Sequence, residues 1–312
     1  MKKDFIALGF LIIFSTATWA NPAYETAINN ALSWLNQAQN QDGSWGSSDS
    51  IKMLYTSEAV LALRANNKIN DAYYRGITWL ENHASQNIDY KARRILALAV
   101  HGDNLLTDTQ YLQLAQQVSS PGNNGWGLSP FYNGSAIDSS LALLAYSELN
   151  ETNNVQLALD FLKAIQLTDV ANQEQGWSLG QGTTSDIITT SQITQVLIKY
   201  LSTDPTLSTN IANAITTLTA KVAGSTTNVV KGYAALALLR DNPTSVTALS
   251  SLDELLLTQS GVDGSWEQDE YTTSVIVRAL SAANGTDVSS SLTPVHIPDA
   301  KLRAAINNNL GK

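Results

Sequence analysis

The sequence predicts an all-α protein in which six helical hairpins close into a ring of inner and outer helices. Apolar residues recur at helical spacing from Ala23 to Asn284, and the breaks between segments carry Gly, Asn, Asp, Ser and Pro. Four of the helical segments are followed by a turn that contains glycine and tryptophan. A spaced repeat of this kind is a strong indication of architecture and a weak indication of chemistry.

Residues 1–20 have the pattern of a secretory signal peptide. Lys2 and Lys3 precede an apolar run from Phe5 to Phe14, and the segment ends at Thr18-Trp19-Ala20, with small residues at positions 18 and 20. The run is shorter than the roughly 18 apolar residues that a membrane-spanning helix needs, which disfavours the alternative of a retained anchor. We therefore expect cleavage near Ala20 and export of a mature chain without a membrane span, to the periplasm or the extracellular space.

The composition excludes several classes of function. The formal charge of −9 becomes −10 when Lys2, Lys3 and Asp4 leave with the signal peptide, because two positive charges and one negative charge are lost. An acidic exported protein is poorly suited to binding nucleic acid. The chain has no cysteine, which excludes a disulfide framework, a cysteine nucleophile and a thiolate metal ligand.

The helical segments within residues 21–284 pair into six hairpins. In each pair the first helix is amphipathic and the second is rich in Ala and Leu on most sides, so the second helices are expected inside the ring. The predicted pairs are 24–39 with 55–65, 73–85 with 90–100, 110–118 with 137–149, 155–165 with 188–201, 210–222 with 229–240, and 246–258 with 271–283. An open array such as a tetratricopeptide repeat is the alternative, but it keeps a constant period that the unequally spaced tryptophan turns lack.

The tryptophan turns have a physical role that their residues explain. Glycine permits a left-handed backbone at the end of a helix, and tryptophan covers the neighbouring helix ends with a large apolar face. We interpret the tryptophans as structural residues of the turns rather than as ligand contacts; they are Trp45, Trp126, Trp177 and Trp266.

Two of these turns carry a family resemblance. The segments Gln37 to Trp45 and Leu257 to Trp266 resemble the Gln-Trp repeats of squalene–hopene cyclases and protein prenyltransferase β subunits, and the likeness covers about residues 22–284. This resemblance implies an (α/α)6 toroid of the terpenoid cyclase and protein prenyltransferase superfamily, which also includes the thioester domains of complement-like proteins.

The reactive residues of that superfamily are largely missing here. The acid cluster of the cyclases has a single counterpart in Asp138, and five Phe in the whole chain provide few aromatic faces for a carbocation, which disfavours a terpene cyclase. The prenyltransferase zinc site uses Asp, Cys and His, whereas this chain has no Cys and three His without metal-ligand spacing. A thioester also requires Cys. We therefore expect no metal, no cofactor and neither classical activity.

The inner helices of such a toroid run in the same direction, so their first turns are expected to meet at one rim. We predict that this rim binds a polar ligand, which is a peptide, a glycan or a partner protein, because tyrosine and hydroxyl side chains suit such ligands. The alternative is that some Ser, Thr and Asp side chains simply cap helix N-termini; these side chains belong to Ser57, Asp138, Asp186, Thr189 and Thr272. The candidate ligand-binding residues are Tyr55, Glu58, Arg93, Asp138, Thr190 and Tyr271.

Glu58 and Arg93 occupy the same aligned position on neighbouring inner helices, which predicts a salt bridge between them. An alternative function pairs Glu58 with Asp138 as catalytic carboxylates, in an (α/α)6 glycoside hydrolase or lyase that acts on an extracellular polymer. Helix N-termini keep carboxylates ionised, which suits a base better than an acid. We therefore prefer a binding module to an enzyme.

The last segment, residues 285–312, reads as a polar linker followed by a short helical tail. Val295 to Ile306 resembles the short capping helix that opens bacterial leucine-rich-repeat domains of the internalin type. This resemblance implies that the chain is either a fragment of a longer modular protein, with leucine-rich repeats after Lys312, or a toroid with a vestigial tail.

The signal-peptide prediction is tested on the exported protein. We expect N-terminal sequencing of material from the periplasm or the medium to begin at Asn21, because cleavage follows Ala20 and residues 18 and 20 are small. A protein that keeps Met1 and remains in the membrane fraction would contradict it.

Overall fold

The computed structural model describes residues 21–85, 87–101, 105–117 and 124–285, and within these residues it contains twelve α-helices and two short 3-10 helices. The predicted signal peptide and the predicted tail lie outside the described residues. The α-helices are α1 Pro22–Ala38, α2 Asp49–Ala65, α3 Asp71–Asn82, α4 Ile88–Leu98, α5 Leu106–Gln117, α6 Ala136–Leu149, α7 Val155–Ala164, α8 Ile187–Tyr200, α9 Ser208–Val222, α10 Asn228–Asp241, α11 Val246–Thr258 and α12 Glu270–Ala283.

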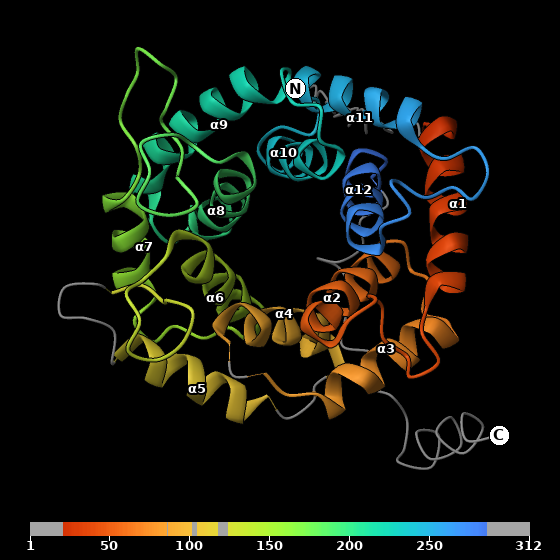
Figure 1. Ribbon diagram of the computed structural model, residues 1–312. Helices are drawn as coiled ribbons and strands as arrows, with labels where there is room; N and C mark the ends of the chain where they lie inside the picture. The colour runs from red at the N-terminus through yellow and green to blue at the C-terminus, as the bar shows by residue number, and fades with distance from the viewer. Residues whose placement is uncertain (1–20, 86, 102–104, 118–123, 286–312) are drawn as a thin grey trace, which may run out of the picture.

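The helices form two concentric rings. The even-numbered helices surround the middle of the molecule and the odd-numbered helices lie outside them (Figure 1). Each inner helix packs against the next inner helix, and α12 packs against α2 and α1, which completes the circle. The all-α toroid of six hairpins is therefore confirmed, and the open array is not the arrangement adopted.

Hydrogen bonds between the first helix of the ring and its last hairpin hold the ring shut. The backbone N–H of Asn21 donates to Oδ1 of Asn284 at 2.6 Å. The hydroxyl of Tyr24 donates to Oδ1 of Asp253 at 2.9 Å, and Nε2 of Gln259 donates to the carbonyl of Ala27 at 2.9 Å. Residues more than 200 positions apart are thus neighbours, as closure requires.

The difference between inner and outer helices follows from their apolar patterns. The outer helix α1 buries Tyr24, Ile28 and Leu35 on one face and exposes Glu25 and Asn29 on the other. The inner helix α10 buries every residue from 232 to 239, because it is apolar nearly all round. Burial of this kind is the main favourable term that holds the two rings together.

Each tryptophan of the four turns is clamped between an outer and an inner helix. All four side chains are fully buried. The backbone N–H of Trp45 donates to the hydroxyl of Thr56 on α2 at 3.0 Å, and its indole N–H donates to the carbonyl of Leu35 on α1 at 2.8 Å. The same two bonds recur with Ser139 and Leu112 around Trp126, Thr190 and Leu162 around Trp177, and Thr273 and Leu255 around Trp266.

The glycines of the turns serve two different purposes. Gly43 and Gly264 adopt the left-handed backbone that the sequence predicts, with φ of 92° and 82°. Gly125 and Gly176 do not; at these positions a Cβ would lie 2.5 Å from Oγ of Ser139 and 2.4 Å from Oγ1 of Thr190. In the Gly-Trp turns glycine is therefore required because the inner-helix hydroxyl of the clamp approaches so closely.

A glutamine near the end of the outer helix joins each turn to the next hairpin. Gln39 donates through Nε2 to the carbonyls of Gly43 and Ala72, and Gln259 donates in the same way to Gly264 and Ala27. Gln116 and Gln166 make the corresponding pairs of bonds in their own turns. One amide thus donates to a carbonyl of the turn and to a carbonyl near the start of a neighbouring outer helix at the same time.

Several predicted helix starts were wrong. Helix α2 begins at Asp49, so Tyr55 and Ser57 lie in its middle rather than in its first turn. Ser135 and Asp269 are the capping residues of α6 and α12, where the capping alternative predicts Asp138 and Thr272. Asp186 caps α8 by accepting a hydrogen bond from the backbone N–H of Thr189, as the capping alternative predicts for this residue. Several polar residues in each of these loops can cap a helix, and nothing in the sequence indicates which of them does so.

Gln259 provides a test of the ring-closing bonds. Gln259→Ala removes two hydrogen bonds, to the carbonyls of Gly264 and Ala27, so we expect the free energy of unfolding to fall by about 1–3 kcal/mol. Urea denaturation followed by circular dichroism measures it. The control Gln37→Ala changes an exposed glutamine on α1 and is expected to stay within about 0.5 kcal/mol of the unmodified protein. Equal effects of the two variants would contradict the role of Gln259.

Candidate functional site

The inner face of the ring carries a buried network of charges around Glu58. This carboxylate is 3% exposed, and its two oxygens accept bonds from Arg93 of α4 at 2.8 Å and Arg278 of α12 at 2.6 Å. Arg93 also forms an ion pair with Asp89 on its own helix. The predicted salt bridge between Glu58 and Arg93 is therefore confirmed, and Glu58 has a second cationic partner that the sequence did not indicate.

The Arg93 guanidinium stays charged in this network although it is buried. Burial lowers the pKa of the Arg93 guanidinium, but the neighbouring Asp89, Tyr271, Tyr233 and Glu58 outweigh that effect and hold the pKa well above its ordinary value. Removing one member of a buried ion pair leaves an uncompensated charge, which is strongly destabilising. Glu58 is thus committed to two guanidinium groups and is poorly placed to act as a catalytic base.

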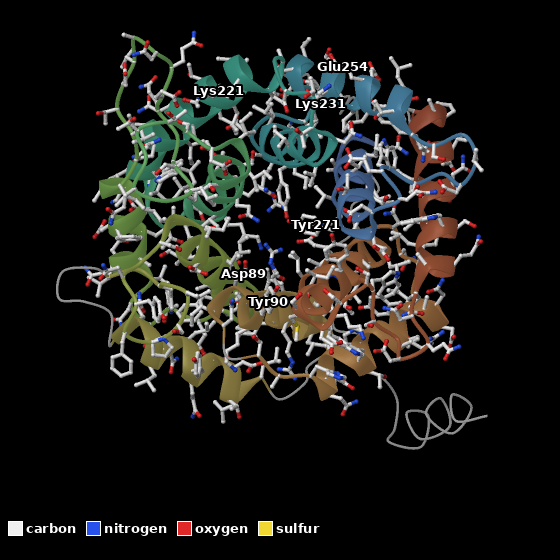
Figure 2. All side chains as sticks on the ribbon, in the orientation of Figure 1. Asp89, Tyr90, Lys221, Lys231, Glu254 and Tyr271 are labelled. Carbon is white, nitrogen blue, oxygen red and sulfur yellow. The ribbon has the colours of Figure 1, made fainter. Side chains whose placement is uncertain are left out.

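Tyrosine side chains lie against this network. Tyr271 of α12 shares a hydrogen bond of 2.6 Å with Tyr233 of α10, and its ring centroid lies 5.7 Å from that of Tyr55. The Tyr55 hydroxyl donates to Oδ2 of Asp269 at 2.7 Å. Tyr271 and Asp89 lie on the inner side of the ring, whereas Lys221 lies at the outer side (Figure 2). Four predicted rim residues, Tyr55, Glu58, Arg93 and Tyr271, are thereby brought together.

Asp138 lies in the first turn of α6 and is only 6% exposed. Burial raises the pKa of its carboxyl to about 6, and Asp89 acts in the same direction, whereas a hydrogen bond from Ser135 and the charge of Arg93 act against it. The Ser135 hydroxyl donates to Oδ2 of Asp138 at 2.5 Å. Asp138 is therefore a desolvated carboxyl that takes up a proton near neutral pH, which is the property of an acid rather than of the base that the sequence suggested.

Thr190 does not face the rim. Its side chain is fully buried, and its hydroxyl accepts the backbone N–H of Trp177 at 3.0 Å as part of the turn clamp. The hydroxyl is therefore used to hold the hairpin together. We leave Thr190 out of the ligand-binding residues that we propose below.

A groove of about 500 Å³ opens beside Asp138, between the loop before α6 and the loop before α8. Its lining contains no charged residue and mixes apolar side chains with amides, hydroxyls and glycines. The lining residues are Asn133, Gly134, Ser135, Ala136, Phe161, Ile165, Leu167, Trp177, Ser178, Leu179, Gly180, Gln181 and Gly182. The sequence analysis did not predict this groove, because loop residues show no periodicity. The signal that was available is the presence of apolar residues within glycine-rich loops.

Two apolar side chains stand out from the loops that form the groove. Phe131 is 79% exposed and holds a φ of 72°, a left-handed conformation that is unusual for an aromatic residue. Leu179 lines the groove and is 65% exposed. Strained backbone and exposed apolar side chains are features that proteins retain at binding sites.

Within the described ranges, no group of three or more His, Cys, Asp or Glu side chains is arranged to hold a metal ion. Among the same residues, no helix has both the length and the apolar character needed to cross a membrane.

Comparison with known proteins places the fold but not the function. No family model and no curated protein matches this sequence. Among solved structures, the type II terpene cyclase MstE from Scytonema aligns with a TM-score of 0.66 and 14% identity, over 85% of this chain and 99% of the cyclase chain. The GH76A α-1,6-mannanase from Salegentibacter sp. HEL1_6 aligns with a TM-score of 0.60 and 12% identity, over 84% and 99% of the two chains. At these identities the likeness establishes a shared helical toroid.

The pKa of Asp138 gives a test by pH. The folded-state pKa of about 6 lies above the ordinary 3.8, so the stability that Asp138 contributes is present below about pH 4 and is lost as the pH rises to 6. Asp138→Asn has no carboxyl to ionise, so the variant does not lose this stability as the pH rises. We expect the variant to gain up to about 3 kcal/mol relative to the unmodified protein between pH 4 and pH 7. Urea denaturation across this pH range measures the difference, and a difference that does not change with pH would contradict the assignment.

Proposed function

We propose that this protein is an exported module that binds a neutral glycan in the groove between the loops before α6 and α8. The observation that carries the proposal is the uncharged lining of that groove, in a chain of formal charge −9. Sugars present hydroxyl groups and apolar ring faces, and both find partners there. The amide of Gln181 can donate and accept hydrogen bonds, and the Ser178 hydroxyl, which donates to the carbonyl of Gly180, can still accept one. Phe161 and Leu179 offer apolar contact.

Other classes of ligand fit this groove less well. A charged peptide would bring charges to a lining that has no opposite charge to meet them. A partner protein needs about 800 Å² of surface on each side, far more than one groove between two loops provides. Of the predicted rim residues, Asp138 is a neighbour of the groove, since Ser135 both lines the groove and binds the carboxyl of Asp138.

A second candidate function is a toroidal glycoside hydrolase or lyase, and the raised pKa of Asp138 is the observation that favours it. A carboxyl that is partly protonated near neutral pH suits a general acid. Glycoside hydrolysis also needs a second carboxylate. Here Glu58, the other carboxylate of the predicted pair, is held by Arg93 and Arg278, and the fold of the mannanase is an analogy only.

Two glycines allow the binding site to be blocked without strain. At Gly180, in the groove, and at Gly261, in the loop after α11, a Cβ would have no atom within 4 Å, and neither glycine has a positive φ. We expect Gly180→Phe to weaken glycan binding at least about tenfold, because the new ring fills the groove, whereas Gly261→Phe binds like the unmodified protein.

The measurement is a microarray of neutral oligosaccharides that includes α-1,6-mannotriose, followed by calorimetric titration of the best ligand. Unchanged binding by Gly180→Phe, or an array without any bound sugar, would contradict the proposal. Release of new reducing ends from the bound glycan by the unmodified protein, and its loss in Asp138→Asn, would favour the hydrolase instead.

A further inference from the structure

A second recess lies at the same end of the ring as the groove, where the outer helix α3 ends. Its volume is about 410 Å³. The end of α3, the starts of the inner helices α2 and α4, and the first tryptophan turn supply its lining. The groove is formed by the loops before α6 and α8, so both concavities open near the N-termini of inner helices.

One wall of the recess is a pair of stacked aromatic rings. Trp79 and His83 lie four positions apart at the end of α3, which brings their side chains to the same side of the helix. Their ring centroids are 4.1 Å apart, and their planes differ by 10°. Trp79 is buried, whereas His83 is exposed. The recess therefore presents an aromatic ring whose position is fixed by the larger ring on which it lies.

Hydrogen-bonding groups of both kinds surround this ring. Nδ1 of His83 lies 2.7 Å from the carbonyl oxygen of Trp79, and because a carbonyl only accepts, Nδ1 carries the proton and Nε2 of the neutral ring is an acceptor. Asp49, whose side chain is 98% exposed, adds acceptors, and Lys52, which contacts both Asp42 and Asp49, adds a donor. An apolar ring face beside donors and acceptors suits a sugar.

A loop of the chain connects the recess with the groove. Tyr90 lines the recess, and two positions before it the backbone N–H of Ile88 donates to the carbonyl of Leu128 at 2.9 Å. From Leu128 the chain continues to Asn133, which lines the groove. This stretch of five residue steps covers at most roughly 18 Å. The recess and the groove are therefore close together on one end of the ring.

Two aromatic side chains of the connecting loop are exposed. Phe131 is 79% exposed and Tyr132 is 58% exposed. The loop that carries them is held by backbone bonds from Tyr132 to Ser129 at 3.2 Å and from Ser135 to Trp126 at 2.8 Å. The left-handed conformation of Phe131 costs stability, and an exposed ring gains little from burial to offset that cost. A ligand that packs on this ring supplies the missing contact.

We propose that the recess at the end of α3 is a second sugar subsite, and that the ligand is a glycan chain that runs from the groove across Phe131 and Tyr132 to His83. This inference rests on the proposed function of the groove and narrows the ligand to oligosaccharides and polysaccharides. When one chain occupies two linked subsites, the second contact is intramolecular, so the affinity rises with chain length.

Helix-end packing explains only part of this arrangement. A stack of Trp79 and His83 stabilises the last turn of α3 whether or not a ligand binds. Packing does not require a recess of about 410 Å³ next to the stack, and it does not require exposed aromatic rings on the loop that leads from the recess to the groove. A chain of sugars that contacts all three features accounts for them together.

The test measures how affinity depends on chain length. The purified full-length protein is titrated calorimetrically with neutral manno-oligosaccharides and gluco-oligosaccharides, from the trisaccharide to the hexasaccharide. In the series that binds, we expect the hexasaccharide to bind at least about tenfold more tightly than the trisaccharide. Ala84→Phe places a ring in the recess at an exposed position, so we expect the gain to fall to about twofold or less while trisaccharide binding is unchanged.

Ala223→Phe is the matched control, because Ala223 is also an exposed alanine at the end of an outer helix, α9, and lines neither the groove nor the recess. It is expected to keep the full gain. Phe131→Ala is a second variant that removes an exposed ring and opens no cavity in the core. We expect it to lower hexasaccharide affinity about threefold or more and to leave trisaccharide affinity unchanged.

The outcomes separate this subsite from the groove. A hexasaccharide that binds no better than the trisaccharide, or an Ala84→Phe variant that keeps the gain, would overturn the second subsite and leave the groove proposal standing. Equal losses at both lengths in Ala84→Phe would also overturn it, because the recess would then not act as an extension. Gly180→Phe is expected to weaken both lengths, and an unmodified protein that binds neither length would reject the groove and the subsite together.

Discussion

The structure depends on one interaction that is repeated four times: a tryptophan held between an inner-helix hydroxyl and an outer-helix carbonyl. The bond to the inner helix uses the backbone N–H, and the bond to the outer helix uses the indole, so each clamp fixes the two helices of a hairpin relative to each other. Because the indole is fully buried, a missing partner would leave a desolvated donor, which makes each clamp more costly to break than a surface hydrogen bond.

A ring built in this way has two chemically different ends. Every inner helix follows a turn from its outer partner, so the six inner N-termini share one end and the six C-termini share the other. Acidic side chains gather near the first end, as Asp89, Asp138 and Glu270 do, and basic side chains such as Arg64, Lys199 and Arg240 gather at the second. The helix dipoles favour this separation of charge, and the closed ring concentrates it into two small areas.

The sequence predicted most of the fold, because the features that decide the fold are local. The tryptophan turns and the apolar Ala and Leu positions of the inner helices can be recognised within a few residues of one another, and the register of neighbouring hairpins was sufficient to predict the bond between Glu58 and Arg93. The site was less predictable. The beginning of α2 at Asp49 is polar and lacks periodicity, and the role of Thr190 depends on a tryptophan thirteen positions earlier in a folded turn. The groove forms only when two loops about 45 residues apart meet, and no local pattern encodes that meeting.

The same ring supports a terpene cyclase and a mannanase, so the ring itself specifies neither reaction. What distinguishes this chain is how it fills the inner face. A catalytic carboxylate has to change its proton or its partner during a reaction, whereas Glu58 is held by two guanidinium groups in a buried site where losing either would leave an unpaired charge. The groove between the loops before α6 and α8 is lined by none of these paired charges, so the polar groups that remain accessible there are the amides and hydroxyls of the loops and not the carboxylates of the ring.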